Sequence, residues 1–98
     1  MLLAHAVTLA EARSYLAGLA DQALTFDASV EYERVLLQLD FLHADFTPGI
    51  SRVPTYGRDA LFEVAYGAIA ELAEHGIDLL SVELLLDMLE VAWAKDLP

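Results

Sequence analysis

The C-terminal segment 81–95, SVELLLDMLEVAWAK, is the part of the sequence that most restricts the fold. With about 100° of rotation per residue, as in an α-helix, Glu83, Asp87 and Glu90 fall on one narrow stripe. The apolar residues cover roughly 220° of the circumference, whereas a surface helix needs an apolar face only somewhat wider than about 100°. A helix of this kind must be covered on most of its sides. The segment therefore predicts a helical bundle or an interface between chains.

Local signals mark the starts of two earlier helices. Thr8 is followed three residues later by Glu11, which is the pattern of a capping box. We therefore expect the first helix to start after Thr8, with residues 1–7 forming an arm or an extra turn. Asp27 or Ser29 is suited to cap a second helix, because short oxygen-bearing side chains accept hydrogen bonds from the free N–H groups of a first turn.

The second half of the chain predicts two more helices and no strand. Gly76 follows a helical pattern and suits the left-handed position that ends a helix, and Ser81 is suited to cap the last helix. No sustained alternation of apolar and polar residues is present. We therefore predict one all-α domain over residues 1–98, an antiparallel four-helix bundle with helices at about 8–24, 28–45, 58–75 and 81–95.

The second predicted helix has two apolar stripes. The wide stripe includes Val35 and Leu39, and a narrow stripe on the opposite side holds Val30, Leu37 and Phe41. One stripe should face the core of the domain. The other needs a second neighbour, which is either another helix of this chain or a different chain.

The connection 47–57 is the longest in the chain, and its length favours a functional role. It carries Arg52 and Tyr56, and Arg58 follows directly, so two of the five basic residues lie within seven positions. The alternative is structural: the segment spans the end of the bundle and its arginines pair with nearby acids.

Charge and composition restrict the class of partner. The net charge of −11 disfavours direct binding to nucleic acid or to an anionic membrane surface. It would attract a basic protein, or it only keeps an apolar chain in solution. The apolar fraction of 57% needs an outlet such as a partner or a homodimer. The absence of cysteine, of a signal-peptide pattern and of a long apolar run indicates a cytoplasmic protein without a membrane span.

No motif in the sequence indicates catalysis, a metal or a cofactor. His43 follows Asp40 by three residues and His75 follows Glu71 by four, and acid–histidine pairs at this spacing can share a metal. Carboxylate-bridged bundles need two Glu-x-x-His pairs and further glutamates facing the core, and His5 lies in an undefined arm. We therefore predict no metal site and no enzymatic activity.

The sequence thus predicts a non-enzymatic module that binds another protein. In charge and size alone it is similar to small acidic inhibitors, immunity proteins and antitoxins, which suggests a basic partner. The alternatives are an obligate homodimer and a bundle that binds a small molecule or a metal. The residues predicted to contact the partner are Val30, Leu37, Phe41, Arg52, Tyr56, Arg58, Glu83, Asp87, Glu90 and Trp93.

Overall fold

The computed structural model, which describes residues 2–53 and 57–97, is an antiparallel four-helix bundle, as predicted. Within these ranges the chain forms helices and no strand. A short 3₁₀ helix, η1, continues the third α-helix. The elements in chain order are α1 (Leu3–Asp21), α2 (Phe26–Leu42), α3 (Arg58–Glu71), η1 (Leu72–His75) and α4 (Leu79–Lys95).

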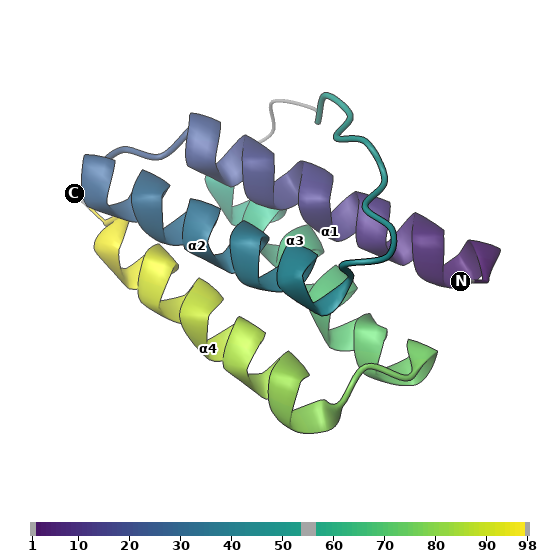
Figure 1. Ribbon diagram of the computed structural model, residues 1–98. Coiled ribbons are helices and arrows are strands. Elements are labelled where there is room, and N and C mark those ends of the chain that lie inside the picture. Colours follow the sequence, from purple (N-terminus) through teal and green to yellow (C-terminus); the bar gives the residue numbers. More distant parts are fainter. Residues whose placement is uncertain (1, 54–56, 98) are drawn as a thin grey trace.

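Each helix packs against two antiparallel neighbours (Figure 1). α1 lies beside α2 and α3, and α4 lies beside the same two helices from the opposite corner. α2 and α3 therefore run in the same direction across the diagonal. The chain must return along the full length of the bundle between them, so the expectation that this connection only spans one end is wrong.

The returning connection lies on α1. The Ser51 backbone N–H donates to the Ser14 hydroxyl at 3.0 Å. Gly18 had been expected on the polar side of its helix, where it would only weaken it, but it is buried beneath the connection. A Cβ at this position would lie 2.5 Å from a methyl carbon of Val53, so glycine is what allows the connection to approach the helix.

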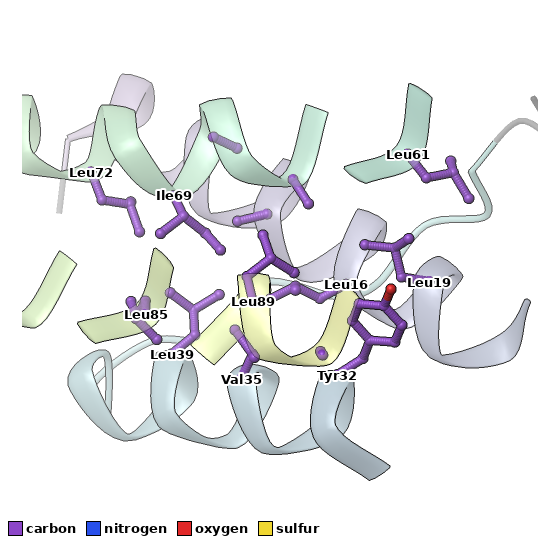
Figure 2. Packing of buried hydrophobic residues seen from close by; sticks show 14 of the residues in the cluster. Leu16, Leu19, Tyr32, Val35, Leu39, Leu61, Ile69, Leu72, Leu85 and Leu89 are labelled. Atoms are coloured by element: carbon purple, nitrogen blue, oxygen red, sulfur yellow. The ribbon is translucent and has the colours of Figure 1, made fainter. Parts of the chain in front are cut away.

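The core contains side chains from all four α-helices. Figure 2 shows Leu16 of α1, Val35 of α2, Ile69 of α3 and Leu89 of α4 meeting between the ribbons, and each is fully buried. On α1 the buried apolar positions recur every three or four residues, which is the spacing that keeps one face of a helix on a core. The bundle therefore follows from the apolar periodicity of the four segments.

The predicted starts of three helices need correction. α1 begins at Leu3, so Thr8 is not a cap but a buried residue within the helix. Apolar residues before Thr8 continue the helix toward the N-terminus. α2 is capped by Thr25, whose hydroxyl accepts from the Ala28 N–H at 3.1 Å, and α4 is capped by Asp78 rather than Ser81.

Gly76 ends the third helical segment, as predicted. The last turn tightens into η1, and Gly76 then adopts a φ of 93°. This left-handed conformation favours glycine because it has no Cβ. The chain can therefore turn directly into α4.

Asp96 had been expected in a polar tail, but its side chain is 0% exposed. Its carboxylate accepts from the Tyr32 hydroxyl at 2.9 Å and from the Leu24 N–H at 2.7 Å. It also forms an ion pair with Arg58 at 2.8 Å. One carboxylate thus joins the end of α4 to α2, to α3 and to the link before α2.

Candidate functional site

The narrow apolar stripe of α2 lies on the outside of the bundle. At about 100° per residue, Leu37 and Phe41 lie opposite the buried Val35 and Leu39. Their side chains are 68% and 76% exposed, and Phe26, on the same side of the helix, is 82% exposed. The predicted need for a second neighbour therefore stays unmet within the described part of the chain.

Helix α4 adds apolar side chains beside this stripe. α2 and α4 lie side by side and antiparallel (Figure 1), and Lys95 of α4 reaches Glu31 of α2 at 3.3 Å. Leu80, Leu84 and Val91 lie on one side of α4 over about three helical turns, and all three are exposed. The outer apolar face, as we name it here, comprises Phe26, Val30, Leu37 and Phe41 of α2 with Leu80, Leu84 and Val91 of α4.

The expectation that only acids form the exposed edge of α4 is wrong. Glu83, Asp87 and Glu90 are exposed as predicted, but Leu84 and Val91 are exposed as well. The physical reason is that α4 occupies a corner of the bundle and packs only against α2 and the α3–η1 segment. Two neighbours cannot cover an apolar arc as wide as the one that this helix carries.

Acids border the outer apolar face while most bases are occupied within the chain. Glu33 of α2 and the acidic stripe of α4 are exposed. The ion pairs formed by the bases are Arg13–Asp40 at 2.7 Å, Arg58–Asp96 at 2.8 Å, Lys95–Glu31 at 3.3 Å and Arg34–Glu31 at 3.4 Å. The surplus of negative charge therefore lies on the surface around apolar side chains.

Two of the predicted contact residues belong to a different part of the structure. Trp93 is half-buried and packs on Phe62 of α3, with ring centroids 4.7 Å apart. The Arg58 guanidinium lies 5.6 Å from the centre of the same indole and is paired with Asp96. Trp93 and Arg58 therefore make contacts within the chain on the α3 side of α4, and not on the outer apolar face.

Arg52, the predicted contact residue of the connection 47–57 that the structure describes, does not join the face either. Arg52 is exposed and lines a groove of about 440 Å³ between the connection and α1, together with Asp21 and Gln22. Tyr56 lies outside the described residues. The structure thus places the apolar residues of α2 and the acids of α4 on the same side of the bundle, but not Arg52.

Sequence reasoning missed a cluster of all three histidines of the chain. His5, His43 and His75 meet at the end of the bundle where α1 begins and where α2 and η1 end. The pKa of His5 is lowered, first by burial and then by the charges of His43 and His75. No local signal could have found this cluster, because the end of the third helix lies beside the start of the first only when the chain returns along α1 between α2 and α3.

Comparisons with known proteins give no relative, since no family model, no curated protein and no solved structure matches the chain. None of the described helices is both long and apolar enough to cross a membrane. The function is therefore argued from the geometry of the chain itself.

Proposed function

We propose that this chain is a non-enzymatic, cytoplasmic interaction module that binds a partner protein through the outer apolar face. The observation that carries the proposal is the exposure of Leu37 and Phe41, at 68% and 76%, on the side of α2 opposite its buried face. Large apolar side chains that are exposed on one side of a helix and bordered by polar residues are typical of protein–protein contact sites. An α-helix or another apolar surface of the partner would lie along α2 and α4.

The charge distribution supports a partner with a basic rim around an apolar centre. Exposed acids flank the face on α4, and the chain has a net charge of −11. Opposite charges at the rim of an interface accelerate association and add salt dependence, whereas buried aromatic residues carry most of the affinity. Phe41 and Phe26 would be these aromatic residues, and Glu83, Asp87 and Glu90 would steer the partner. An inhibitor, immunity or antitoxin role against a basic protein is one form of this function.

A homodimer through the same face is the second candidate, and the spacing of α2 favours it. Val30, Leu37 and Phe41 follow one another along α2 at intervals of seven and four residues. This is the spacing of a two-helix seam. A pair of α2 helices from two copies would then bury Leu37 and Phe41 against each other.

The proposal is tested with Phe41→Glu, and Val7→Glu is the matched control. Val7 is an exposed apolar residue on α1, so its substitution adds the same charge on a helix outside the face. Both variants should keep the circular dichroism and the melting temperature of the wild type to within a few degrees, because substitutions of exposed residues usually change stability by less than about 0.5 kcal/mol.

The binding measurement compares the immobilised proteins in extracts of the native host at low and high salt. A partner bound by the wild type and by Val7→Glu should be lost with Phe41→Glu and should elute at high salt. Sedimentation at micromolar concentration separates the two candidates, because a dimer that Phe41→Glu converts to a monomer indicates self-association. Equal capture by all three proteins would contradict a role for the outer apolar face.

A further inference from the structure

The three histidines of the chain form one cluster at the end of the bundle away from Asp96. His5 lies in the first turns of α1, His43 directly follows α2, and His75 ends η1. The Nε2 atoms of His5 and His43 are 3.0 Å apart. The His75 ring is stacked on the His5 ring, with centroids 5.3 Å apart and planes 6° apart. Three segments far apart in the sequence thus supply three imidazoles to one place.

The hydrogen bonds of His43 determine which of its nitrogens is free. Its Nδ1 lies 2.9 Å from the Leu39 carbonyl oxygen, which can only accept a hydrogen bond. Nδ1 must therefore carry the proton, and the lone pair of a neutral His43 is on Nε2, directed at His5. A backbone carbonyl that fixes the proton on the far nitrogen is the arrangement that commonly orients histidine metal ligands in proteins.

We propose that His5 and His43 bind a divalent transition-metal ion of the Zn²⁺, Ni²⁺ or Cu²⁺ class through their Nε2 atoms. These are the ions for which imidazole is a suitable ligand. Two ligands at 2.0–2.1 Å from a tetrahedral ion would have nitrogens about 3.3–3.4 Å apart. The observed separation of 3.0 Å needs an adjustment of only a few tenths of an ångström. Neutral His5 would then carry its proton on Nδ1.

The observed geometry supplies two metal ligands, the Nε2 atoms of His5 and His43, and further ligands could enter from the adjoining pocket. Among the residues that the structure describes, no three metal-binding side chains converge on one point. The histidines open into a pocket of about 310 Å³ that Asp45 also lines. His75 is held at its Nε2 only by a 3.3 Å hydrogen bond to Thr8. Rotation of the His75 ring would supply the third nitrogen, and water would complete the coordination.

Nearby carboxylates favour a cation at this position. Glu74 lines a second pocket together with His5 and His75, and Glu71 accepts a hydrogen bond from Thr8 at 3.5 Å. Their negative charge would lower the energy of a divalent ion beside the three imidazole rings. These acids lie at the periphery of the site and are not proposed as ligands.

The experiment is calorimetric titration of the untagged protein with zinc, nickel and copper salts at pH 7.5, with magnesium as the control ion. We expect saturable binding of about one zinc, nickel or copper ion per chain at micromolar concentration, and no binding of magnesium, which prefers oxygen ligands. The melting temperature should rise by several degrees at saturation, because the ion binds the folded state preferentially. His5→Gln should weaken binding by about tenfold or more.

Two further measurements distinguish binding of the metal ion by the histidines from non-specific binding by the surface carboxylates. Copper bound to the wild type should show electron-spin coupling to the imidazole nitrogens of His5, His43 and His75, and His5→Gln should remove one of these couplings. His75→Gln should weaken zinc binding less than His5→Gln does; unchanged affinity in this variant would remove His75 as the third ligand. Magnesium binding as tight as zinc binding, or full zinc affinity in His5→Gln, would overturn the proposal.

Discussion

The two ends of the bundle each contain a buried polar cluster, and the two clusters differ in kind. At one end Asp96 is a single negative group surrounded by donors from Tyr32, Leu24 and Arg58. The carboxylate needs the donors, and the hydroxyl of Tyr32, a fully buried residue, needs an acceptor. A buried charge is stable only when its partners satisfy it in this way.

At the other end His5, His43 and His75 are three groups of the same kind. One imidazole can donate to another while both are neutral, but protonation of the cluster places like charges within one small volume. The Asp96 end therefore joins the helices through complementary groups, one carboxylate and its donors. At the histidine end the pKa of His5 is lowered, first by burial and then by its two histidine neighbours, so this end should lose stability as the pH falls below neutral. It also retains lone pairs that a metal can use.

The largest effect is expected for Asp96→Ala. The substitution leaves the Tyr32 hydroxyl and the Leu24 N–H without their acceptor and removes the partner of Arg58. Removing one member of a buried ion pair typically costs about 3–5 kcal/mol. Urea unfolding followed by circular dichroism at pH 7 should show a loss of this size in the free energy of unfolding.

Asp96→Asn is the matched control for this prediction. Asparagine keeps the volume and one acceptor oxygen but has no negative charge for Arg58. The free energy of unfolding of Asp96→Asn should therefore lie between that of the wild type and that of Asp96→Ala. A loss of less than about 1 kcal/mol in both variants would mean that this end of the bundle contributes no more than an exposed ion pair does.

The next effect is expected for Tyr32→Phe. The variant removes the donor to Asp96 and keeps the buried ring, so about 2 kcal/mol should be lost, which is typical of a hydrogen bond to a charged group. The pKa of Tyr32 is raised, first by burial and then by its hydrogen bond to Asp96. The wild type should therefore lose stability as the pH rises above about 10, where an unfolded tyrosine ionises, and Tyr32→Phe should lose less.

The helices and their apolar faces could be predicted from the sequence because their causes are local. Residues three and four positions apart share a helix face whatever the rest of the chain does. For this reason the four helices and the second stripe of α2, with Leu37 and Phe41, could be placed in advance. Helix starts were less certain, because several short polar side chains near a helix start suit a cap. Thr8 fits the pattern but lies within α1, and Thr25 caps α2 in place of Asp27 or Ser29.

The two polar clusters could not be predicted because their causes are long-range. Asp96 meets Tyr32 across 64 positions of sequence, and His5 meets His43 across 38. These contacts depend on which helix ends adjoin, and that depends in turn on the return of the chain along α1. Gly18 was the local sign of this return, but a glycine in a helix gives no information about its partner, Val53.

A smaller effect is expected from acid at the histidine end. The pKa of His5 is lowered by burial and by its two histidine neighbours. An unfolded histidine binds a proton near pH 6.5, whereas folded His5 binds it only at lower pH. Stability should therefore be constant above about pH 7.5 and should fall as the pH drops below about 6.5. Melting temperatures measured from pH 8 to pH 5 give this profile.

His5→Asn is the variant that assigns this acid effect to the cluster. It removes one titrating ring and the repulsion that this ring exerts on His43 and His75, so the melting temperature should fall less between pH 7 and pH 5. Tyr32→Phe, at the other end, should keep the slope of the wild type. The carboxylates of Asp45, Glu71 and Glu74 oppose the effect, and an identical slope in His5→Asn would show that they cancel it.

The smallest effect is expected for Thr8→Val, which removes a hydroxyl from the histidine end. Thr8 is buried, but its hydroxyl is 3.5 Å from Glu71 and 3.3 Å from His75, and both contacts are longer than ordinary hydrogen bonds of a hydroxyl group. Glu71 is exposed and His75 is half-buried, so water can replace the lost partner. The free energy of unfolding should change by less than about 1 kcal/mol. If Thr8→Val lost as much free energy of unfolding as Tyr32→Phe, polar contacts would stabilise the histidine end as strongly as the Asp96 end. That result would contradict the difference between the two ends.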